Sequence, residues 1–215
     1  MGDQTGFPLV LSGPSGGGKT SVCDALRHRR TDVEFSISAT SRSPRAGEVD
    51  GGHYHFVSRD RFQEMARDGD LLEWAEVHGE LYGTPMSNLS ACSDSGRVLL
   101  LDIDVQGART VRGNLPSALL VFLLPPSARH LLDRLRGRGS EGPDALQRRM
   151  RSALSELEAV SEFDYAVVND ELSSTVDAVE SILVAERAAV RRLGTDVMGR
   201  AAALATELKG TMSGT

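Results

Sequence analysis

The sequence has few of the features that mark membrane, secreted or nucleic-acid-coating proteins. Only two of its 215 residues are cysteine, and Cys23 and Cys92 are too far apart for a metal-ligand cluster or a disulfide framework, which is typical of a reducing compartment. The longest apolar run, 118–124, is too short to span a bilayer. Because the net charge is -6, nucleic acid is disfavoured as the main partner. We therefore expect a cytoplasmic protein with no membrane or nucleic-acid partner, and the composition leaves its oligomeric state open.

Lysine is also scarce, yet one of the two lysines stands in a glycine-rich segment. The segment consists of Gly13, Pro14, Ser15, Gly16, Gly17, Gly18, Lys19 and Thr20, and it fits the pattern GxxxxGK followed by Ser or Thr. An apolar run at 7–11 precedes it and a helical pattern at 19–30 follows it. In this context the loop N–H groups and the helix N-terminus bind phosphate, the lysine reaches the β and γ phosphates, and the threonine hydroxyl ligates Mg²⁺. The segment therefore predicts binding of a nucleoside triphosphate with magnesium.

Apolar runs and helical patterns alternate along the chain. The runs are continuous rather than alternating, which is typical of strands covered on both faces, and they lie at 7–11, 35–39, 98–102, 118–124 and 165–169. Helical patterns lie at 19–30, 59–67, 105–112, 127–136, 144–160 and 172–192. The pattern predicts an α/β fold with a parallel sheet flanked by helices.

Two stretches interrupt this alternation. Residues 38–85 are polar and include short alternating segments at 53–57 and 72–81, which predict a small antiparallel insertion. Residues 134–151 are rich in arginine and interrupted by glycine and proline, as in a mobile flap. Both are candidate lids. The end of the chain has a weak Ala-rich helical stretch at 200–208, and its composition favours a frayed tail over a stable helix.

Two carboxylates follow the strand predicted at 98–102. Asp102 and Asp104 would lie at the carboxyl edge of the sheet, where open α/β sheets place their sites. One of them is suited to hold magnesium or a magnesium-bound water. The alternative for Asp104 is that it caps the next helix, and this does not exclude a role in the site.

The insertion carries motifs that make a family resemblance specific. These are Ser38-Ala39-Thr40-Ser41-Arg42-Ser43-Pro44-Arg45, then Gly51-Gly52-His53-Tyr54, Leu72-Glu73-Trp74 and Tyr82-Gly83-Thr84. Together with the glycine-rich loop, the Asp-Ile-Asp strand end and the arginine-rich stretch, in this order, the sequence over about 7–192 resembles the guanylate kinase family. Ser41 and Thr84 depart from the usual threonine and serine, but both keep a hydroxyl.

The resemblance implies both an architecture and an activity. It implies a P-loop NTPase core at 1–37, 86–127 and 157–194, a mixed α/β GMP-binding insertion at 38–85, a helical lid at 128–156 and a tail at 195–215. It also implies transfer of the γ-phosphoryl group of ATP to GMP, and to dGMP, with Mg²⁺. Two alternatives remain open at this point: a P-loop kinase for another small phosphorylated acceptor, and a non-catalytic interaction module.

The same resemblance assigns roles to individual residues. It places the GMP phosphate on Arg42, Arg45, Tyr54 and Tyr82, and the rest of GMP among Ser38, Glu73, Thr84, Asp102 and Asp104. ATP is assigned to the loop from Gly13 to Thr20 with Arg134, Arg138 and Asn169. Lys19, Arg42, Arg138 and Arg149 are the expected catalytic residues, and Thr20, with Asp102 through water, is the expected magnesium site. The chemistry fits, because arginine forks and phenols suit a phosphate dianion and a glutamate can accept two N–H groups of guanine.

Overall fold

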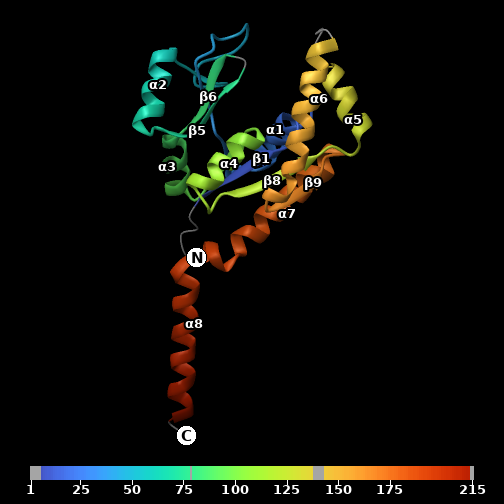
Figure 1. Ribbon diagram of the computed structural model, residues 1–215. Helices are drawn as coiled ribbons and strands as arrows, with labels where there is room; N and C mark the ends of the chain where they lie inside the picture. Colours follow the sequence, from blue (N-terminus) through green and yellow to red (C-terminus); the bar gives the residue numbers. More distant parts are fainter. Residues whose placement is uncertain (1–5, 78, 138–142, 214–215) are drawn as a thin grey trace.

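The computed structural model of the protein describes residues 6–77, 79–137 and 143–213. Its central sheet has five parallel strands in the order β2-β7-β1-β8-β9 (Figure 1). These are β1 (Phe7–Ser12), β2 (Val33–Phe35), β7 (Val98–Asp102), β8 (Leu119–Leu124) and β9 (Tyr165–Val168). The predicted α/β class with a parallel sheet is confirmed.

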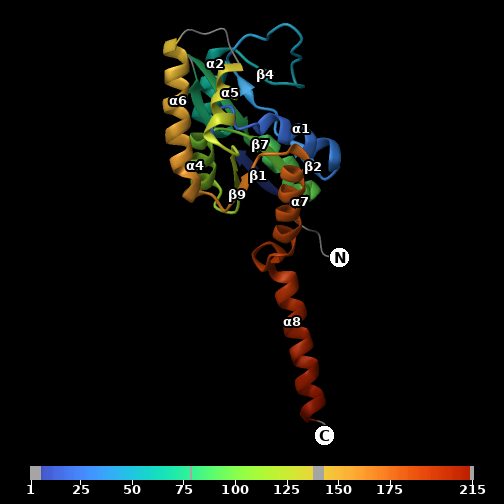
Figure 2. The ribbon, with the colours of Figure 1, turned by 90° about the vertical axis from the view of Figure 1, so that its right-hand side faces the viewer.

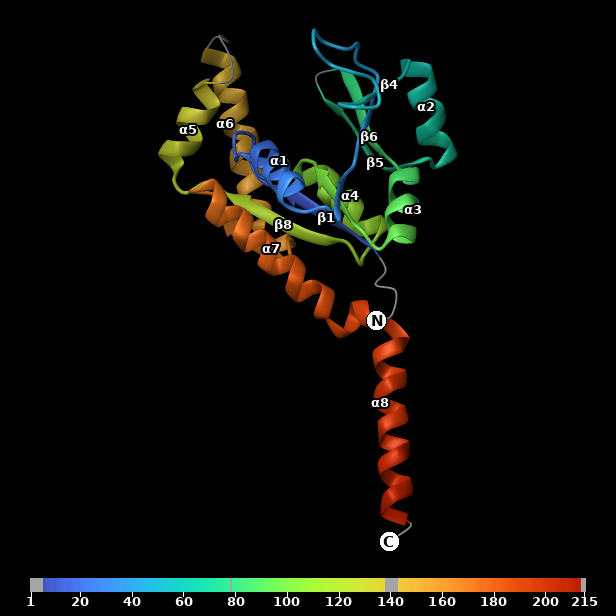
Figure 3. The same cartoon turned by 180° about the vertical axis from the view of Figure 1, so that it is seen from behind.

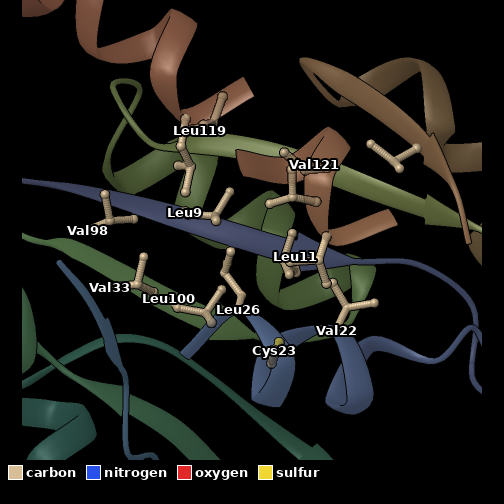
Figure 4. Close-up of a cluster of buried hydrophobic side chains, with 14 of the residues drawn as sticks. Leu9, Leu11, Val22, Cys23, Leu26, Val33, Val98, Leu100, Leu119 and Val121 are labelled. Atoms are coloured by element: carbon tan, nitrogen blue, oxygen red, sulfur yellow. The ribbon is translucent and has the colours of Figure 1, made fainter. Parts of the chain in front are cut away.

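Helices cover both faces of this sheet, which explains why its strands are apolar without alternation. Leu9 and Leu11 of β1 point to one face, where they pack with α1 (Lys19–Arg29) and α7 (Leu172–Ala188), while Val10 points to the other. Figure 4 shows the first of these clusters, with Val22 and Leu26 of α1 packed against the strands. The second face is covered by α3 (Met86–Ser95) and α4 (Val105–Asn114). Each fully buried leucine stabilises the fold by roughly 1.5–3 kcal/mol.

A second sheet lies between β2 and α3 in the chain. It has the order β4-β3-β6-β5, formed by β3 (Ala39–Thr40), β4 (His55–Phe56), β5 (Leu71–Val77) and β6 (Glu80–Pro85), with α2 (Arg59–Asp68) packed against it. Its β5–β6 and β3–β6 pairs are antiparallel, as expected, but β3 and β4 pair in parallel. The expectation of an antiparallel insertion is therefore wrong for this pair, because the long connection from 41 to 54 brings β4 back beside β3 in the same direction.

The lid segment forms two helices, α5 (Ala128–Gly137) and α6 (Pro143–Glu158). They stand on the opposite side of the sheet's carboxyl edge from the insertion (Figures 1 and 3). A short 3₁₀ helix, η1 (Ala159–Glu162), joins α6 to β9. The glycine-rich loop before α1 thus lies between the two projecting parts.

Three expectations about element boundaries are wrong. The apolar run at 35–39 is divided between two sheets, since β2 ends at Phe35 and β3 begins at Ala39. The helix α3 was not predicted, because its serine-rich sequence has no clear apolar stripe, although Cys92 is fully buried in the core. The pattern at 172–192 is two helices, because Ala189 is extended and the buried Glu186 accepts hydrogen bonds from Arg191 and Arg192.

The C-terminal segment forms a long helix rather than a tail with a short helical stretch. Helix α8 spans Val190–Ser213, 24 residues, and extends away from the rest of the protein in every view (Figures 1, 2 and 3). The prediction of a frayed segment is wrong. It relied on the glycine and threonine around this stretch, but the alanines within it favour helix. Within the described residues, no helix combines the length and apolarity needed to cross a membrane.

Candidate active site

The glycine-rich loop connects β1 to α1, and its glycines are required by its shape. Gly18 has φ +87°, and a Cβ there would lie 2.4 Å from the side-chain nitrogen of Asn169. Gly13 has φ +142°, and a Cβ there would meet the Leu123 carbonyl oxygen at 2.4 Å. Side chains at these positions would therefore push the loop away from β8 and β9. The loop ends where α1 begins, so its N–H groups and the helix N-terminus converge as an anion site requires.

Three predicted donor-site residues contact this loop. The Lys19 ammonium donates to the Gly13 carbonyl at 2.7 Å and to the Pro14 carbonyl at 3.4 Å. The Asn169 amide donates to the Gly17 carbonyl at 2.7 Å, and Arg134 of α5 reaches the same carbonyl at 3.4 Å. The structure thus gathers Lys19, Asn169 and Arg134 at one loop.

The lid also touches the loop through a residue that the sequence did not reveal. Glu156 of α6 accepts a hydrogen bond from the Ser15 N–H at 2.8 Å, and Ser152 donates to its other oxygen at 3.1 Å. A carboxylate therefore binds one of the loop's own N–H groups. No spacing rule singles out Glu156, because the contact joins residues 141 apart.

The described part of the structure does not place the two remaining predicted lid arginines at the loop. Arg149 of α6 donates to the Leu135 carbonyl of α5 at 2.8 Å, so in this state it links the two lid helices. Arg138 lies outside the described residues. The assignment of these two arginines to the transferred phosphate stays a prediction.

The predicted magnesium ligands are adjacent. The Thr20 hydroxyl donates to an Asp102 carboxylate oxygen at 3.1 Å, joining the first turn of α1 to the end of β7. Hydroxyl and carboxylate oxygens are the hard ligands that Mg²⁺ prefers, usually with phosphate oxygens and water completing its shell. Among the described residues no group of three or more His, Cys, Asp or Glu side chains could hold a metal by itself. The donor set therefore fits a magnesium ion that arrives with a triphosphate.

A second cluster in the insertion gathers the residues expected to hold a phosphate; we call Arg42, Tyr54, Tyr82 and Glu48 the acceptor cluster. Arg42 Nε donates to the Tyr82 hydroxyl at 3.2 Å, and the guanidinium lies 5.3 Å from the centre of the Tyr54 ring. The Tyr54 and Tyr82 rings meet edge to face at 6.0 Å. Arg45 presents only its backbone N–H to the cluster, since its side chain is exposed.

Glu48 is the member of the acceptor cluster that the sequence did not reveal. It accepts two hydrogen bonds from Arg42, at 2.8 and 2.9 Å, and one from the Arg45 N–H at 2.7 Å. These charge-assisted bonds, with Arg42 the largest cause, lower the pKa of Glu48 to about 2 and raise that of Arg42. A useful signal was that Glu48 is the one acidic residue between 38 and 49.

Almost all N–H groups of the Arg42 guanidinium already donate hydrogen bonds within the protein. Of its five N–H groups, one meets Tyr82, one meets the Ser43 carbonyl and two meet Glu48. One N–H of Nη2 remains, and the Tyr82 hydroxyl, which accepts from Arg42, keeps its own hydrogen to donate. Glu48 therefore fixes Arg42 in an orientation that leaves donors for one more anion.

The residues expected around guanine form a separate polar group. The buried Glu73 of β5 accepts a hydrogen bond from the Thr84 hydroxyl of β6 at 2.7 Å, across the register pair that joins these strands. Its second oxygen faces Gly107, where a Cβ would lie 3.2 Å away. Burial, together with the nearby Asp104 charge, raises the pKa of Glu73. Ser38 is half-buried and precedes Ala39, which pairs with Gly83 next to Thr84, and its carbonyl accepts from the His55 N–H at 2.9 Å.

The end of β7 joins the donor and acceptor parts. Asp102 accepts from Thr20 of the donor loop, and two residues later Asp104 lies within electrostatic reach of Glu73. Asp104 also caps α4 by accepting a hydrogen bond from the Gly107 N–H at 2.7 Å. The predicted capping is therefore confirmed, and it does not exclude a role of Asp104 in the site. Burial is the main cause of the raised pKa of Tyr54, followed by the neighbouring Tyr82, and the charge of Asp102 adds to them. The residues at this strand end thus connect the phosphate loop with the buried Glu73.

Comparison with known proteins identifies the family that shares this arrangement. The sequence profile described as Guanylate kinase matches residues 5–186. The chain is 45% identical over 191 residues to a guanylate kinase of Clostridium perfringens, covering 89% of this chain and 88% of the relative. It is 49% identical over 183 residues to one of Rhodococcus jostii, covering 84% and 88%. Among solved structures, guanylate kinase from Anaplasma phagocytophilum matches with a TM-score of 0.72 and 32% identity, over 88% of this chain and 90% of that one.

Proposed function

The chain belongs to the guanylate kinase family, whose activity is ATP-dependent phosphorylation of GMP, and from this premise we propose how its own residues perform that reaction. The proposal is that ATP and GMP give ADP and GDP by in-line transfer. A new bond joins the γ-phosphorus to a phosphate oxygen of GMP, while the bond to the β–γ bridging oxygen breaks and that oxygen leaves with ADP. The observation that supports it best is that Asp102, at the end of β7, accepts a hydrogen bond from Thr20 of the donor loop, while Asp104, two residues later, lies near the buried Glu73.

The donor half is the loop from Gly13 to Thr20. Its N–H groups bind the phosphates of ATP, and the Lys19 ammonium leaves the Gly13 carbonyl to neutralise the charge on the β and γ phosphates. Asn169 and Arg134, which donate to the Gly17 carbonyl, hold the loop in shape and contact the bound nucleotide in this proposal. The lid closes over this half, and Arg138 and Arg149 then reach the transferred phosphoryl group and water is excluded.

Thr20 and, through water, Asp102 would hold a magnesium ion bound to ATP. When bound, it neutralises the negative charge that develops on the phosphate oxygens.

The acceptor half holds the phosphate of GMP as a dianion. A nucleoside monophosphate has a second pKa of about 6, so at neutral pH its phosphate is largely deprotonated and needs no general base. Arg42, Arg45, Tyr54 and Tyr82 donate to its oxygens, and Glu48 keeps Arg42 in place for that task. Catalysis is then alignment and charge neutralisation.

Guanine is selected by acceptors that adenine cannot satisfy. Glu73 accepts from the N1–H and the exocyclic amino group together, while Ser38, Thr84 and Asp104 complete the site. An adenine in this position would leave a buried carboxylate without donors, and such mismatches reduce kcat/KM by up to roughly 10⁴-fold. None of these residues is assigned to the 2′-hydroxyl, so dGMP is an acceptor as well. The product GDP places the enzyme in purine nucleotide synthesis and recycling, and we expect it in the cytoplasm.

A coupled assay with a panel of acceptors tests the proposal. With ATP and Mg²⁺, we expect turnover with GMP and dGMP, and little or none with AMP, UMP or sugar phosphates. Turnover without a preference for guanine would remove the role given to Glu73 and Ser38. Absence of turnover with every acceptor would contradict phosphoryl transfer itself.

A further inference from the structure

Helix α8 has an apolar stripe that takes no part in the proposed reaction. The family match ends at residue 186, before this helix begins. Its apolar residues recur at spacings of 3, 4, 4, 3, 4 and 4, at Val190, Leu193, Val197, Ala201, Leu204, Leu208 and Met212. This is an 11-residue repeat, which keeps one face of a nearly straight helix apolar along its length. The side chains of Leu204, Leu208 and Met212 are 61%, 65% and 80% exposed.

The rest of the protein gives this helix little support. Its first turns pack against α7 and, through Arg192, against Phe7, and beyond them the helix extends from the body (Figure 2). Gly199 and Gly210 stand within it with open space around them, and each glycine costs a helix about 1 kcal/mol relative to alanine. Isolated helices of this kind are marginal in water, and most of their stability in proteins comes from packing an apolar face. We therefore expect the apolar stripe to pack against a partner surface.

We propose that the stripe of α8 pairs with the same stripe of a second copy of this chain, in antiparallel orientation. With Val197 opposite Met212 of the other copy, Ala201 faces Leu208 and Leu204 faces Ala205, an apolar residue that flanks the stripe, so apolar residues meet along the whole overlap. Small alanines then lie opposite large side chains, which lets the helices approach closely.

Charge complementarity selects this orientation. Arg200 and Glu207 are seven residues apart, on the same side of the stripe, and both are exposed. In the described part of the chain neither side chain has an ion-pair partner. In the antiparallel register each Arg200 lies two residues, about 3 Å, along the axis from Glu207 of the other copy. The dimer thus gains two symmetric ion pairs beside its apolar seam.

The shape of the protein disfavours a parallel pair. At the N-terminal end of α8, the rest of the protein extends to both sides of the helix axis (Figures 1, 2 and 3). Packed helices are about 8–10 Å apart, so parallel pairing would force two bodies into the same space. Antiparallel pairing places the bodies at opposite ends. A membrane surface fits less well, because beyond the first turn, where Arg191 and Arg192 pair with Glu186, α8 has as many acidic as basic residues and so lacks the excess of basic residues that anionic lipids attract.

The pairing is expected to be weak and to depend on concentration. The overlap from Val197 to Met212 is 16 residues, roughly 24 Å of helix. Two helices of this length bury less surface than the approximately 1,200 Å² at the lower end of standard protein interfaces. We therefore expect monomer in dilute solution and dimer as the concentration rises.

Sedimentation equilibrium of the full chain, from micromolar to hundreds of micromolar, tests the proposal. The wild type should move from the monomer mass to the dimer mass, while Leu208→Glu should stay monomeric. Thr206→Glu is the matched control, because it adds the same charge on the opposite face and should still dimerise. GMP phosphorylation and the circular dichroism of the body should be the same in all three proteins.

Charge reversal tests the orientation. Arg200→Glu and Glu207→Arg should each weaken the dimer at least several-fold, and the double variant should restore it, because the reversed charges again lie opposite each other. A wild type that is monomeric throughout, or an association that Leu208→Glu leaves unchanged, would overturn the proposal. Failure of the double variant to recover the dimer would overturn the antiparallel register.

Discussion

Replacing Glu73 with glutamine should change stability and catalysis in opposite directions. Glu73 is only 6% exposed, and burial is the main cause of its raised pKa. A carboxyl group whose pKa is higher in the folded protein than the unfolded value of about 4.5 destabilises the fold at high pH. This penalty is absent below the unfolded pKa and is complete above the folded pKa. Glu73→Gln removes the charge and keeps an oxygen for Thr84, so it should raise the melting temperature of the ligand-free protein at pH 8 and change it little below about pH 4.5.

The same substitution should reduce activity towards GMP. The carboxylate is proposed to accept two N–H groups of guanine, and the amide replaces one acceptor with a donor. Losing a hydrogen bond to a charged group and leaving a buried donor unpaired costs about 3–4 kcal/mol together, or two to three orders of magnitude in kcat/KM. The KM for ATP should not change, because Glu73 has no contact with the donor loop in the described residues.

Thermal unfolding at two pH values and a coupled assay measure both effects. Glu76→Gln is the matched control, since Glu76 lies on the same strand but is about half-exposed and pairs with Arg59 at the surface. A melting temperature at pH 8 that falls on substitution of Glu73 would refute the role of burial. A kcat/KM for GMP close to that of the wild type would refute its contact with guanine.

Three further substitutions test other contacts. Thr20→Ala should raise the Mg²⁺ concentration needed for half-maximal rate by roughly tenfold, whereas Thr20→Ser, which keeps the hydroxyl, should not; equal requirements in a Mg²⁺ titration would contradict the metal contact. Glu48→Gln should raise the KM for GMP about tenfold with the KM for ATP unchanged, because Arg42 loses its ionic partner. Since the pKa of Glu48 is about 2, its stabilising charge is present above about pH 4.5 and lost only as the pH falls towards 2; the pH profile for GMP between 5 and 8 should follow the substrate phosphate in both proteins. Glu156→Gln should lower the KM for ATP and leave that for GMP unchanged in steady-state kinetics, because it weakens the hydrogen bond that the Ser15 N–H donates to the lid and so frees this N–H for the phosphates of ATP.

The sequence predicted best the features that depend on local spacing. The loop from Gly13 to Thr20 could be predicted because the whole motif lies in consecutive residues. The structure shows the strand before it and the helix after it that the motif requires. Asp102 and Asp104 were found because a carboxylate after a buried strand falls at the sheet edge. The parallel sheet followed from apolar runs that do not alternate.

What the sequence missed depends on contacts between distant residues or on competition between local preferences. Glu156 meets Ser15 only when the lid folds over the core, so no local pattern shows it. Glu48 looks like a loop residue until Arg42 is placed opposite it. The break at Ala189 accompanies a contact across it: the buried carboxylate of Glu186 in α7 accepts hydrogen bonds from Arg191 and Arg192 in α8.

The most direct test of the account follows both products of the reaction in one experiment. Incubation of ATP, GMP and Mg²⁺ with the enzyme, followed by chromatographic separation of the nucleotides, should show ADP and GDP formed in equal amounts. Lys19→Met should fold normally by circular dichroism and lose this turnover by orders of magnitude, because the β and γ phosphates lose their cation. ADP formed without GDP in the wild type, or near-normal GDP formation by the Lys19 variant, would contradict the transfer that the donor loop and the acceptor cluster are proposed to perform.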